Sequence, residues 1–320
     1  PRRREAVLGY TQAFASLGGL LVSLVYYAAA TYGDHLPAIL GSHQAWRYTL
    51  ISGVIPAAPL ILVRPFLPES PVWAEERLRN TLRRPSLAEL FRPERRRVTI
   101  VTTVVVAASY AVSFGTNLQA PRIVPTLETV RLLPRGGQEQ AAGAVQVFQE
   151  CGGLTGRILM AALAVWIGTR VRLVRGFLFP SLVIIPLVFG LAPAIGGTTF
   201  FNWGNFLAGL LTVGQFSFWG NYLPRVYPTY LRGTGESFAA NIGGRLIGTS
   251  AALATTTLAG ALPALGLSRS AALVGGAALV IGITASAWLP DPGEAPETTH
   301  APAGSKRPPD TGRDRPGRKP

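Results

Sequence analysis

Four residues share one face of the otherwise apolar stretch 142–168. Gln146, Glu150, Gly153 and Arg157 follow the spacing i, i+4, i+7, i+11, which places them on one side of a helix. Charged groups inside an apolar helix are costly and usually face a cavity or a partner. This face therefore either lines a pathway on which Glu150 or Arg157 binds a solute or a proton, or it is structural. In the structural interpretation, Glu150 is solvated near the helix end and Arg157 hydrogen-bonds neighbouring helices.

Polar side chains also gather in the stretches 98–118 and 199–222. One face of the first stretch, at the spacing i, i+3, i+7, carries Tyr110, Ser113 and Asn117. The second stretch is unusually polar and contains Asn202, Asn205, Gln215, Trp219 and Asn221. Amides and aromatic rings bind sugars and other small polar ligands by hydrogen bonding and stacking, and we favour Gln215 and Trp219 as such a pair. Polar contacts between helices are the alternative, and the spacing does not decide between the two.

A third candidate pair, Asn241 and Arg245, lies one turn apart at the start of the stretch 236–262. We expect this pair to cap the helix entrance, with solute contact as the alternative. The sequence has no nucleophile elbow, phosphate-binding loop or Asp-rich magnesium motif. Its three histidines lie outside the apolar stretches, and its one cysteine is Cys151. The sequence therefore predicts no catalytic site, cofactor or metal centre.

The elements that carry these residues are predicted from composition. The chain is 48% hydrophobic and 14% charged, whereas soluble domains carry about 25% charged residues. It is also rich in glycine (36) and proline (26), both of which are more frequent in membrane helices than in soluble ones. These values predict an integral membrane protein surrounded by a lipid bilayer.

Eight apolar stretches are each long enough to cross a bilayer, which takes about 20 residues. They are 8–32, 46–66, 98–118, 142–168, 176–196, 199–222, 236–262 and 271–289. Lipid offers no partner for backbone N–H and C=O groups, so each span must be a helix. The predicted fold class is an all-α integral membrane protein with eight transmembrane helices.

The positive charges are distributed unequally between the two sides of the predicted membrane. Of the 30 Lys and Arg residues, 23 lie at the two ends or in the even-numbered connections, five lie in the odd-numbered connections and two lie inside spans. Positive charge collects on the cytoplasmic side of membrane proteins, so we expect both termini in the cytoplasm. The same sorting explains the net charge of +14 without nucleic-acid binding.

Four segments follow from these spans. Residues 1–66 contain two spans, and 67–97 form a charged cytoplasmic connector. Residues 98–290 contain the remaining six spans. The tail 291–320 is rich in proline, glycine and charge, has too few apolar residues to fold, and is predicted to be disordered.

An internal repeat relates the two groups of spans. Gly18-Gly19-Leu20-Leu21 matches Gly243-Gly244-Arg245-Leu246 at an offset of 225, and Leu67-Pro68-Glu69 matches Leu289-Pro290-Asp291 at an offset of 222. Two landmarks with nearly the same offset predict two parallel halves, of which the first is incomplete. We expect about 130 further residues upstream, enough for four more spans.

Three motifs resemble those of the major facilitator superfamily, in particular its sugar-porter and metabolite–proton symporter branches. They are Pro68-Glu69-Ser70-Pro71-Val72-Trp73, Tyr227-Pro228-Thr229-Tyr230-Leu231-Arg232-Gly233 and Asn241-Ile242-Gly243-Gly244-Arg245. The resemblance implies that the spans correspond to helices five to twelve of a twelve-helix transporter. It also implies a cytoplasmic gate that includes Arg4, Glu69, Arg232 and Arg245, for which solvated loop charges are the alternative.

The resemblance implies secondary active transport of a small polar solute, a sugar or an organic acid, with proton coupling in the cell membrane. The expected partners are that solute, protons and the lipid bilayer. The predicted substrate pathway comprises Tyr110, Asn117, Gln146, Glu150, Arg157, Gln215, Trp219 and Asn241. Two alternatives stay open: a non-transporting fragment of such a permease, and an integral membrane enzyme.

Overall fold

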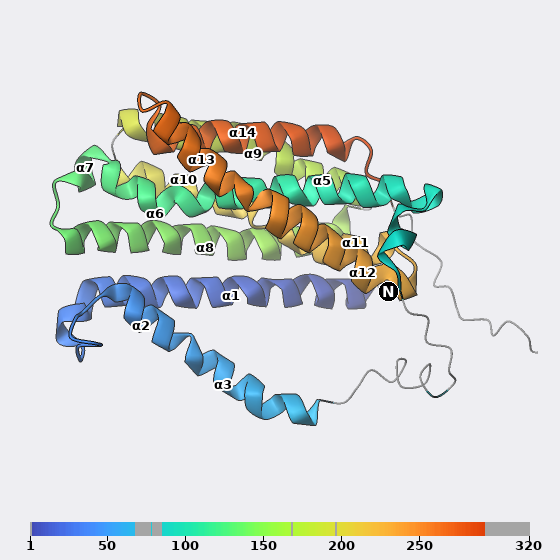
Figure 1. Ribbon diagram of the computed structural model, residues 1–320, viewed down its shortest axis with the longest axis horizontal. Coiled ribbons are helices and arrows are strands. Elements are labelled where there is room, and N and C mark those ends of the chain that lie inside the picture. Colours follow the sequence, from blue (N-terminus) through green and yellow to red (C-terminus); the bar gives the residue numbers. More distant parts are fainter. Residues whose placement is uncertain (1, 68–77, 79–84, 168, 196, 292–320) are drawn as a thin grey trace, which may run out of the picture.

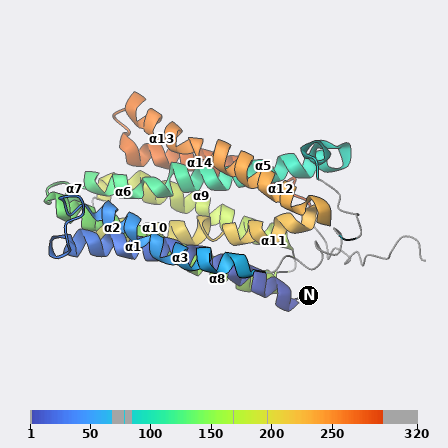
Figure 2. The same ribbon diagram turned by 60° about the horizontal axis from the view of Figure 1, so that its bottom comes forward.

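The protein is a bundle of long helices. The computed structural model describes residues 2–67, 78, 85–167, 169–195 and 197–291, and their regular structure is helical. The helices run side by side along the longest axis of the molecule (Figure 1). Helices α1 (Arg2–Tyr32) and α8 (Arg135–Trp166) are neighbours on one side of the bundle, and α5 (Pro93–Gly115) and α14 (Gly266–Ser286) lie on the other (Figure 2). The predicted all-α fold class is confirmed.

All eight predicted stretches are helical, and three of them are divided. The five undivided stretches form α1, α5, α8, α14 and α9 (Arg170–Ile195). The divided stretches form α2 (Ala45–Ser52) and α3 (Val54–Val63), α10 (Thr198–Thr212) and α11 (Phe216–Val226), and α12 (Arg232–Phe238), a π-helix (Ala239–Gly248) and α13 (Ser250–Ala261). Shorter elements are α6 (Ala120–Ile123), α7 (Glu128–Arg131) and the 3₁₀ helices Gly33–His35, Arg64–Phe66, Leu87–Phe91, Asn117–Gln119, Val124–Thr126 and Thr229–Leu231.

In the part of the chain that the structure describes, five segments are long and apolar enough to cross a membrane. They are Ala13–His35, Ala45–Phe66, Pro93–Thr126, Arg170–Ile195 and Gly266–Ser286. The other three predicted spans coincide with α8, whose polar face lowers its hydropathy, and with the divided stretches 199–222 and 236–262, whose pieces are shorter.

The outward faces of the bundle are apolar. Val183 on α9 is 62% exposed, Leu253 on α13 is 69% exposed and Ile281 on α14 is 55% exposed. Exposed apolar surface is unfavourable in water by about 25 cal/mol per Å², whereas hydrocarbon covers it without that penalty. The interior is filled by large buried side chains that include Leu178, Ile185, Phe189 and Phe201.

The stretch 199–222 is divided by a turn at Val213–Gln215, where Gly214 packs against α8. The Gly214 N–H bonds the carbonyl of Gly209 at 3.3 Å, one residue further back than in an α-helix. A Cβ on Gly214 would lie 2.9 Å from the backbone carbon of Gly156. The turn therefore needs glycine, and it redirects α11 relative to α10.

The stretch 236–262 widens into the π-helix Ala239–Gly248, in which Thr249 N–H bonds the carbonyl of Gly244 at 3.1 Å. Its glycines face α5. A Cβ on Gly243 would lie 2.5 Å from the carbonyl oxygen of Thr103, and one on Gly244 would lie 2.9 Å from the Tyr110 ring. π-helical turns occur frequently at functional sites, and this one leaves room for the Tyr110 side chain.

The predicted connector and tail fall largely outside the described residues, so their boundaries stay predictions. The described end of the connector packs onto the loop that follows α11. Leu90, Tyr227 and Leu231 form a small buried cluster, and the Tyr230 hydroxyl bonds the Glu89 carboxylate at 2.8 Å. This contact joins the 3₁₀ helix before α5 to the segment before α12.

Candidate functional site

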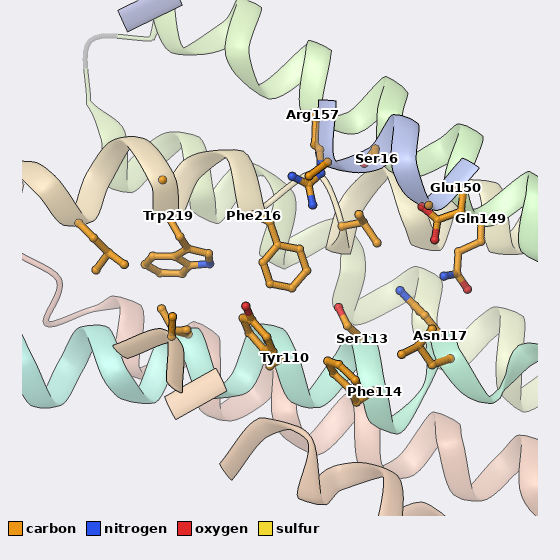
Figure 3. Close-up of a pocket in the computed structure, with 18 of the residues that line it drawn as sticks. Ser16, Tyr110, Ser113, Phe114, Asn117, Gln149, Glu150, Arg157, Phe216 and Trp219 are labelled. Atoms are coloured by element: carbon orange, nitrogen blue, oxygen red, sulfur yellow. The ribbon is translucent and has the colours of Figure 1, made fainter. Parts of the chain in front are cut away.

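A cavity of about 470 Å³ lies between α1, α5, α8 and α11. Figure 3 shows polar and aromatic side chains from these helices pointing into it. α1 contributes Ser16 and Gly19, and α8 contributes Gln149, Glu150 and Arg157. α5, the residues after it, and α11 contribute most of the remaining wall, including Tyr110, Ser113, Phe114, Asn117, Phe216 and Trp219. The cavity is therefore bounded by α1 of the first predicted half and by helices of the second.

Aromatic rings form one part of the wall. Tyr110 stacks on Phe114 with ring centroids 6.0 Å apart, and it meets Phe216 edge-on at 4.9 Å. The turn before α11 brings Phe216 to this position, and Gly244 leaves space behind Tyr110. Trp219 lines the cavity one turn further along α11. Flat aromatic faces of this kind suit a planar ring of a ligand.

Arg157 brings a positive charge into this apolar setting. It is 9% exposed, and its guanidinium carbon lies 5.8 Å from the centroid of the Phe216 ring. A cation over an aromatic face is stabilised by the ring quadrupole. Guanidinium groups also bind carboxylates through two parallel hydrogen bonds, so this side chain suits an anionic ligand group.

Five further polar groups of the wall are buried and have no hydrogen-bond partner among the described residues. They are Ser16 Oγ, Ser113 Oγ, Asn117 Oδ1, Gln149 Oε1 and Trp219 Nε1. Nearly all buried polar atoms in proteins are hydrogen-bonded, and such a group buried alone costs about 1–3 kcal/mol. Their gathering in one cavity suits a ligand or water that supplies the missing bonds.

Glu150 lies at the boundary between α8 and α1. Its carboxylate accepts a hydrogen bond from Gln146 Nε2 at 3.2 Å. A Cβ on Gly19 of α1 would lie 2.5 Å from Glu150 Oε2. The absence of a side chain at position 19 therefore makes room for this carboxyl group against the backbone of α1.

The structure places five predicted pathway residues in the cavity wall: Tyr110, Asn117, Glu150, Arg157 and Trp219. The other three lie outside this wall. Gln146 donates a hydrogen bond to the Glu150 carboxylate. Gln215 is buried; its amide accepts a hydrogen bond from Ser109 and donates one to the Leu211 carbonyl. Asn241 is exposed and bonds Ser237. The roles of all eight stay predictions.

Sequence reasoning missed part of the wall. Ser16, Gln149, Phe216 and Glu236 line the cavity but were not among the predicted site residues. Gln149 lies one residue before Glu150 on the same wide polar face of α8, which is the signal that could have found it. Ser16 precedes Gly19 by three residues, so the two share a face of α1.

The predicted gate is described only in part. The Arg4 side chain and Glu69 lie outside the described residues. Arg232 is exposed and its Nε donates to the Tyr227 carbonyl at 3.3 Å. Arg245 is exposed in the π-helix, where its carbonyl accepts a bond from the Thr249 hydroxyl.

Comparisons with known proteins find similarity to transporters. Residues 1–109 match the family described as "Sugar (and other) transporter". A probable 4-methylmuconolactone transporter of Cupriavidus pinatubonensis is 27% identical over 250 residues, which is 76% of this chain and 52% of the relative. The 3-(3-hydroxy-phenyl)propionate transporter of Escherichia coli is 30% identical over 255 residues, which is 78% of this chain and 57% of the relative.

The chain thus spans about half the length of the curated relatives it matches. The matched relatives are named as transporters, and the apolar helices suit repeated crossing of a bilayer. This chain is a multi-pass membrane protein that is similar to the sugar (and other) transporter family over residues 1–109 and to two curated transporters over about three quarters of its length.

Proposed function

We propose that this protein carries a small organic acid with a planar ring across the cell membrane by alternating access. The observation that carries the proposal is the buried Arg157 guanidinium in a cavity walled by Tyr110, Phe114, Phe216 and Trp219. A carboxylate on the ligand neutralises the cation, and the ring packs between the aromatic side chains.

An acid is favoured over a neutral sugar because of charge. A carboxylate forms charge-assisted, bidentate hydrogen bonds with the Arg157 guanidinium, and these are stronger than the neutral hydrogen bonds that a sugar hydroxyl offers. Names of two relatives support the same choice, because one is a 4-methylmuconolactone transporter and the other a 3-(3-hydroxy-phenyl)propionate transporter. The second name describes a phenyl ring joined to a carboxylate.

Alternating access requires a site between two parts that can move relative to each other. The cavity has α1 on one side and α5, α8 and α11 on the other, which is the boundary between the two predicted halves. The N-terminus, the start of α5 and the end of α14 lie at one end of the bundle (Figure 1). We assign that end to the cytoplasm because the connections there carry most of the arginines.

Uptake into proteoliposomes tests the proposal. The reconstituted protein is given labelled 3-phenylpropionate or labelled glucose at pH 7.5, with protein-free liposomes measuring passive leak. We expect saturable 3-phenylpropionate uptake that excess benzoate inhibits and excess glucose does not. Glucose uptake without acid uptake would overturn the assignment to acids, and no uptake of either would support the non-transporting alternative.

A further inference from the structure

Helices α1 and α8 meet along a line of small and polar residues, here called the α1–α8 seam. At one end, Gln140 Nε2 of α8 donates to Thr31 Oγ1 of α1 at 3.2 Å. Next, a Cβ on Gly143 would lie 3.1 Å from the Cα of Tyr27. Further along, Glu150 faces Gly19. The seam joins the two predicted halves, so it is the contact that alternating access must rearrange.

Glu150 is the acidic residue where the seam meets the cavity, and Figure 3 shows its carboxyl group beside Gln149 on the cavity wall. A Cβ on Gly19 would lie 2.5 Å from its Oε2 and 2.8 Å from its Cδ. Among the described residues Glu150 forms no ion pair, and Gln146 is its hydrogen-bond donor. An ionised carboxylate pressed against a helix backbone inside a membrane is costly, whereas a protonated one is not.

The described titratable groups around Glu150 come from three helices, α8, α5 and α12. On α8 they are the Arg157 guanidinium, about 10 Å away along the axis, and the neighbouring Cys151 thiol. The described wall of α1 is formed by Ala15, Ser16 and Gly19, which do not titrate. α5 contributes the Tyr110 hydroxyl, α11 contributes no titratable side chain to the described wall, and α12 contributes Glu236.

We infer that Glu150 is the proton-binding residue of this transporter and that its protonation offsets the charge of a solute bound at Arg157. This inference rests on the proposed function. Without solute, the Glu150 carboxylate balances the Arg157 cation. When a monocarboxylate binds Arg157, a proton from solution forms an O–H bond with the Glu150 carboxylate, so the sum of the charges is unchanged. On the other side, this O–H bond breaks to release the proton to water as the acid leaves.

The charge balance fixes the stoichiometry at one proton per monocarboxylate. Proton binding is also coupled to the opening of the α1–α8 seam, because the neutral Glu150 carboxyl group packs against Gly19 whereas the ionised one needs hydration. Separation of α1 from α8 therefore favours ionisation, and protonation favours contact. Glu150 therefore couples transport to the proton gradient, whereas solute recognition depends on other residues of the cavity.

The test compares counterflow with accumulation in proteoliposomes, using 3-phenylpropionate as the probe. Counterflow exchanges labelled for unlabelled solute without net proton movement, whereas accumulation needs an imposed gradient, alkaline inside. We expect Glu150→Gln to lose accumulation and proton influx, and to lose far less counterflow, because a neutral Gln resembles the protonated state. Glu139→Gln is the matched control, since Glu139 lies on the same helix in an exposed ion pair with Arg135 and should behave as wild type.

The outcomes separate the two proposals. Wild-type protein without counterflow would overturn the proposed function itself. Wild-type counterflow together with undiminished, proton-linked accumulation by Glu150→Gln would overturn the inference alone. Loss of coupling in Glu236→Gln but not in Glu150→Gln would also overturn it and would transfer the role to Glu236. A solute affinity that falls with rising pH in wild type and is pH-independent in Glu150→Gln supports it.

Discussion

Helix α8 packs most extensively on α10 and α1, and these two contacts are built differently. Against α10 the backbones touch: a Cβ on Gly152 would overlap the carbonyl of Phe206, and one on Gly156 would overlap the carbonyl of Leu210. Against α1 the backbones approach less closely, since a Cβ on Gly143 would lie 3.1 Å from the Tyr27 Cα. Side chains form much of this contact, as in the Gln140–Thr31 hydrogen bond and the Glu150 carboxyl group above Gly19.

The difference indicates which contact is fixed. Close backbone contact through glycines gives tight van der Waals packing and has no alternative side-chain arrangement. Hydrogen bonds between side chains can exchange for bonds to water or to a ligand. We therefore expect α8 and α10 to move as one body and the α1–α8 seam to open and close during transport.

The largest predicted effect is a loss of stability when a large side chain is placed in the α8–α10 contact. Gly156→Leu places a side chain where the backbone of α10 lies, and overpacking of this kind costs about 1–3 kcal/mol or more. We expect loss of folded protein in detergent, measured by size-exclusion chromatography and a thermal melt. Gly176→Leu on exposed α9 surface, where a Cβ would meet nothing within 4 Å, is the control and should fold normally.

The second-largest effect should be on solute binding at the cavity face of α8. Arg157→Gln removes the charged hydrogen-bond donor, worth about 1.5–3 kcal/mol, so the affinity for 3-phenylpropionate should fall by about 10- to 100-fold. Calorimetric titration of the purified protein measures it. Arg131→Gln, which alters an exposed pair with Glu128, should bind normally, and equal losses in both variants would refute a specific role for Arg157.

A smaller effect should come from changing the α1 side of the seam. Gly19→Ala adds a methyl group where the Glu150 carboxyl group lies, and Gly18→Ala adds one where nothing lies within 4 Å. We expect accumulation to fall several-fold in Gly19→Ala and to stay at the wild-type level in Gly18→Ala. Similar accumulation in the two variants would show that the Glu150–Gly19 contact has no part in coupling.

The smallest predicted effect is a modest loss of solute affinity when one side chain of the cavity wall is changed. Trp219→Phe keeps an aromatic face but removes the indole N–H, a hydrogen bond worth about 0.5–1.5 kcal/mol. The Kd for 3-phenylpropionate should rise by about two- to tenfold, measured by the same calorimetry. Trp203, 57% exposed and packed on Phe148 and Phe206, supplies the control Trp203→Phe, which should leave Kd unchanged.

The helical bundle was predictable because the apolar stretches and the arginine distribution are properties of whole segments. The divisions of those helices were not predictable, since they depend on tertiary contacts. The turn at Gly214 forms because this residue packs on Gly156, which is 58 positions earlier in the sequence. Periodicity within a single stretch contains no information about that neighbour.

The same divisions explain why the candidate site was only partly predictable. Tyr110 on α5, and Glu150 and Arg157 on α8, lie in undivided helices where helical spacing holds, and all three line the cavity. Asn117, which also lines it, lies in the 3₁₀ helix directly after α5. Gln215 lies in the turn before α11, where its amide bonds Ser109 and the Leu211 carbonyl, and Phe216 faces the cavity instead. Asn241 lies in the π-helix, whose wider turn changes which residues share a face.

Cross-linking tests the central comparison most directly. In a Cys151→Ser background, one variant carries cysteines at Thr31 and Gln140 across the seam, and another at Phe148 and Trp203, whose rings lie 5.2 Å apart across the α8–α10 contact. Each is joined by a short reducible bifunctional thiol reagent, and 3-phenylpropionate uptake is measured before and after reduction. We predict that the seam cross-link stops uptake until it is reduced and that the α8–α10 cross-link leaves uptake intact. Full uptake with the seam cross-linked would contradict the account.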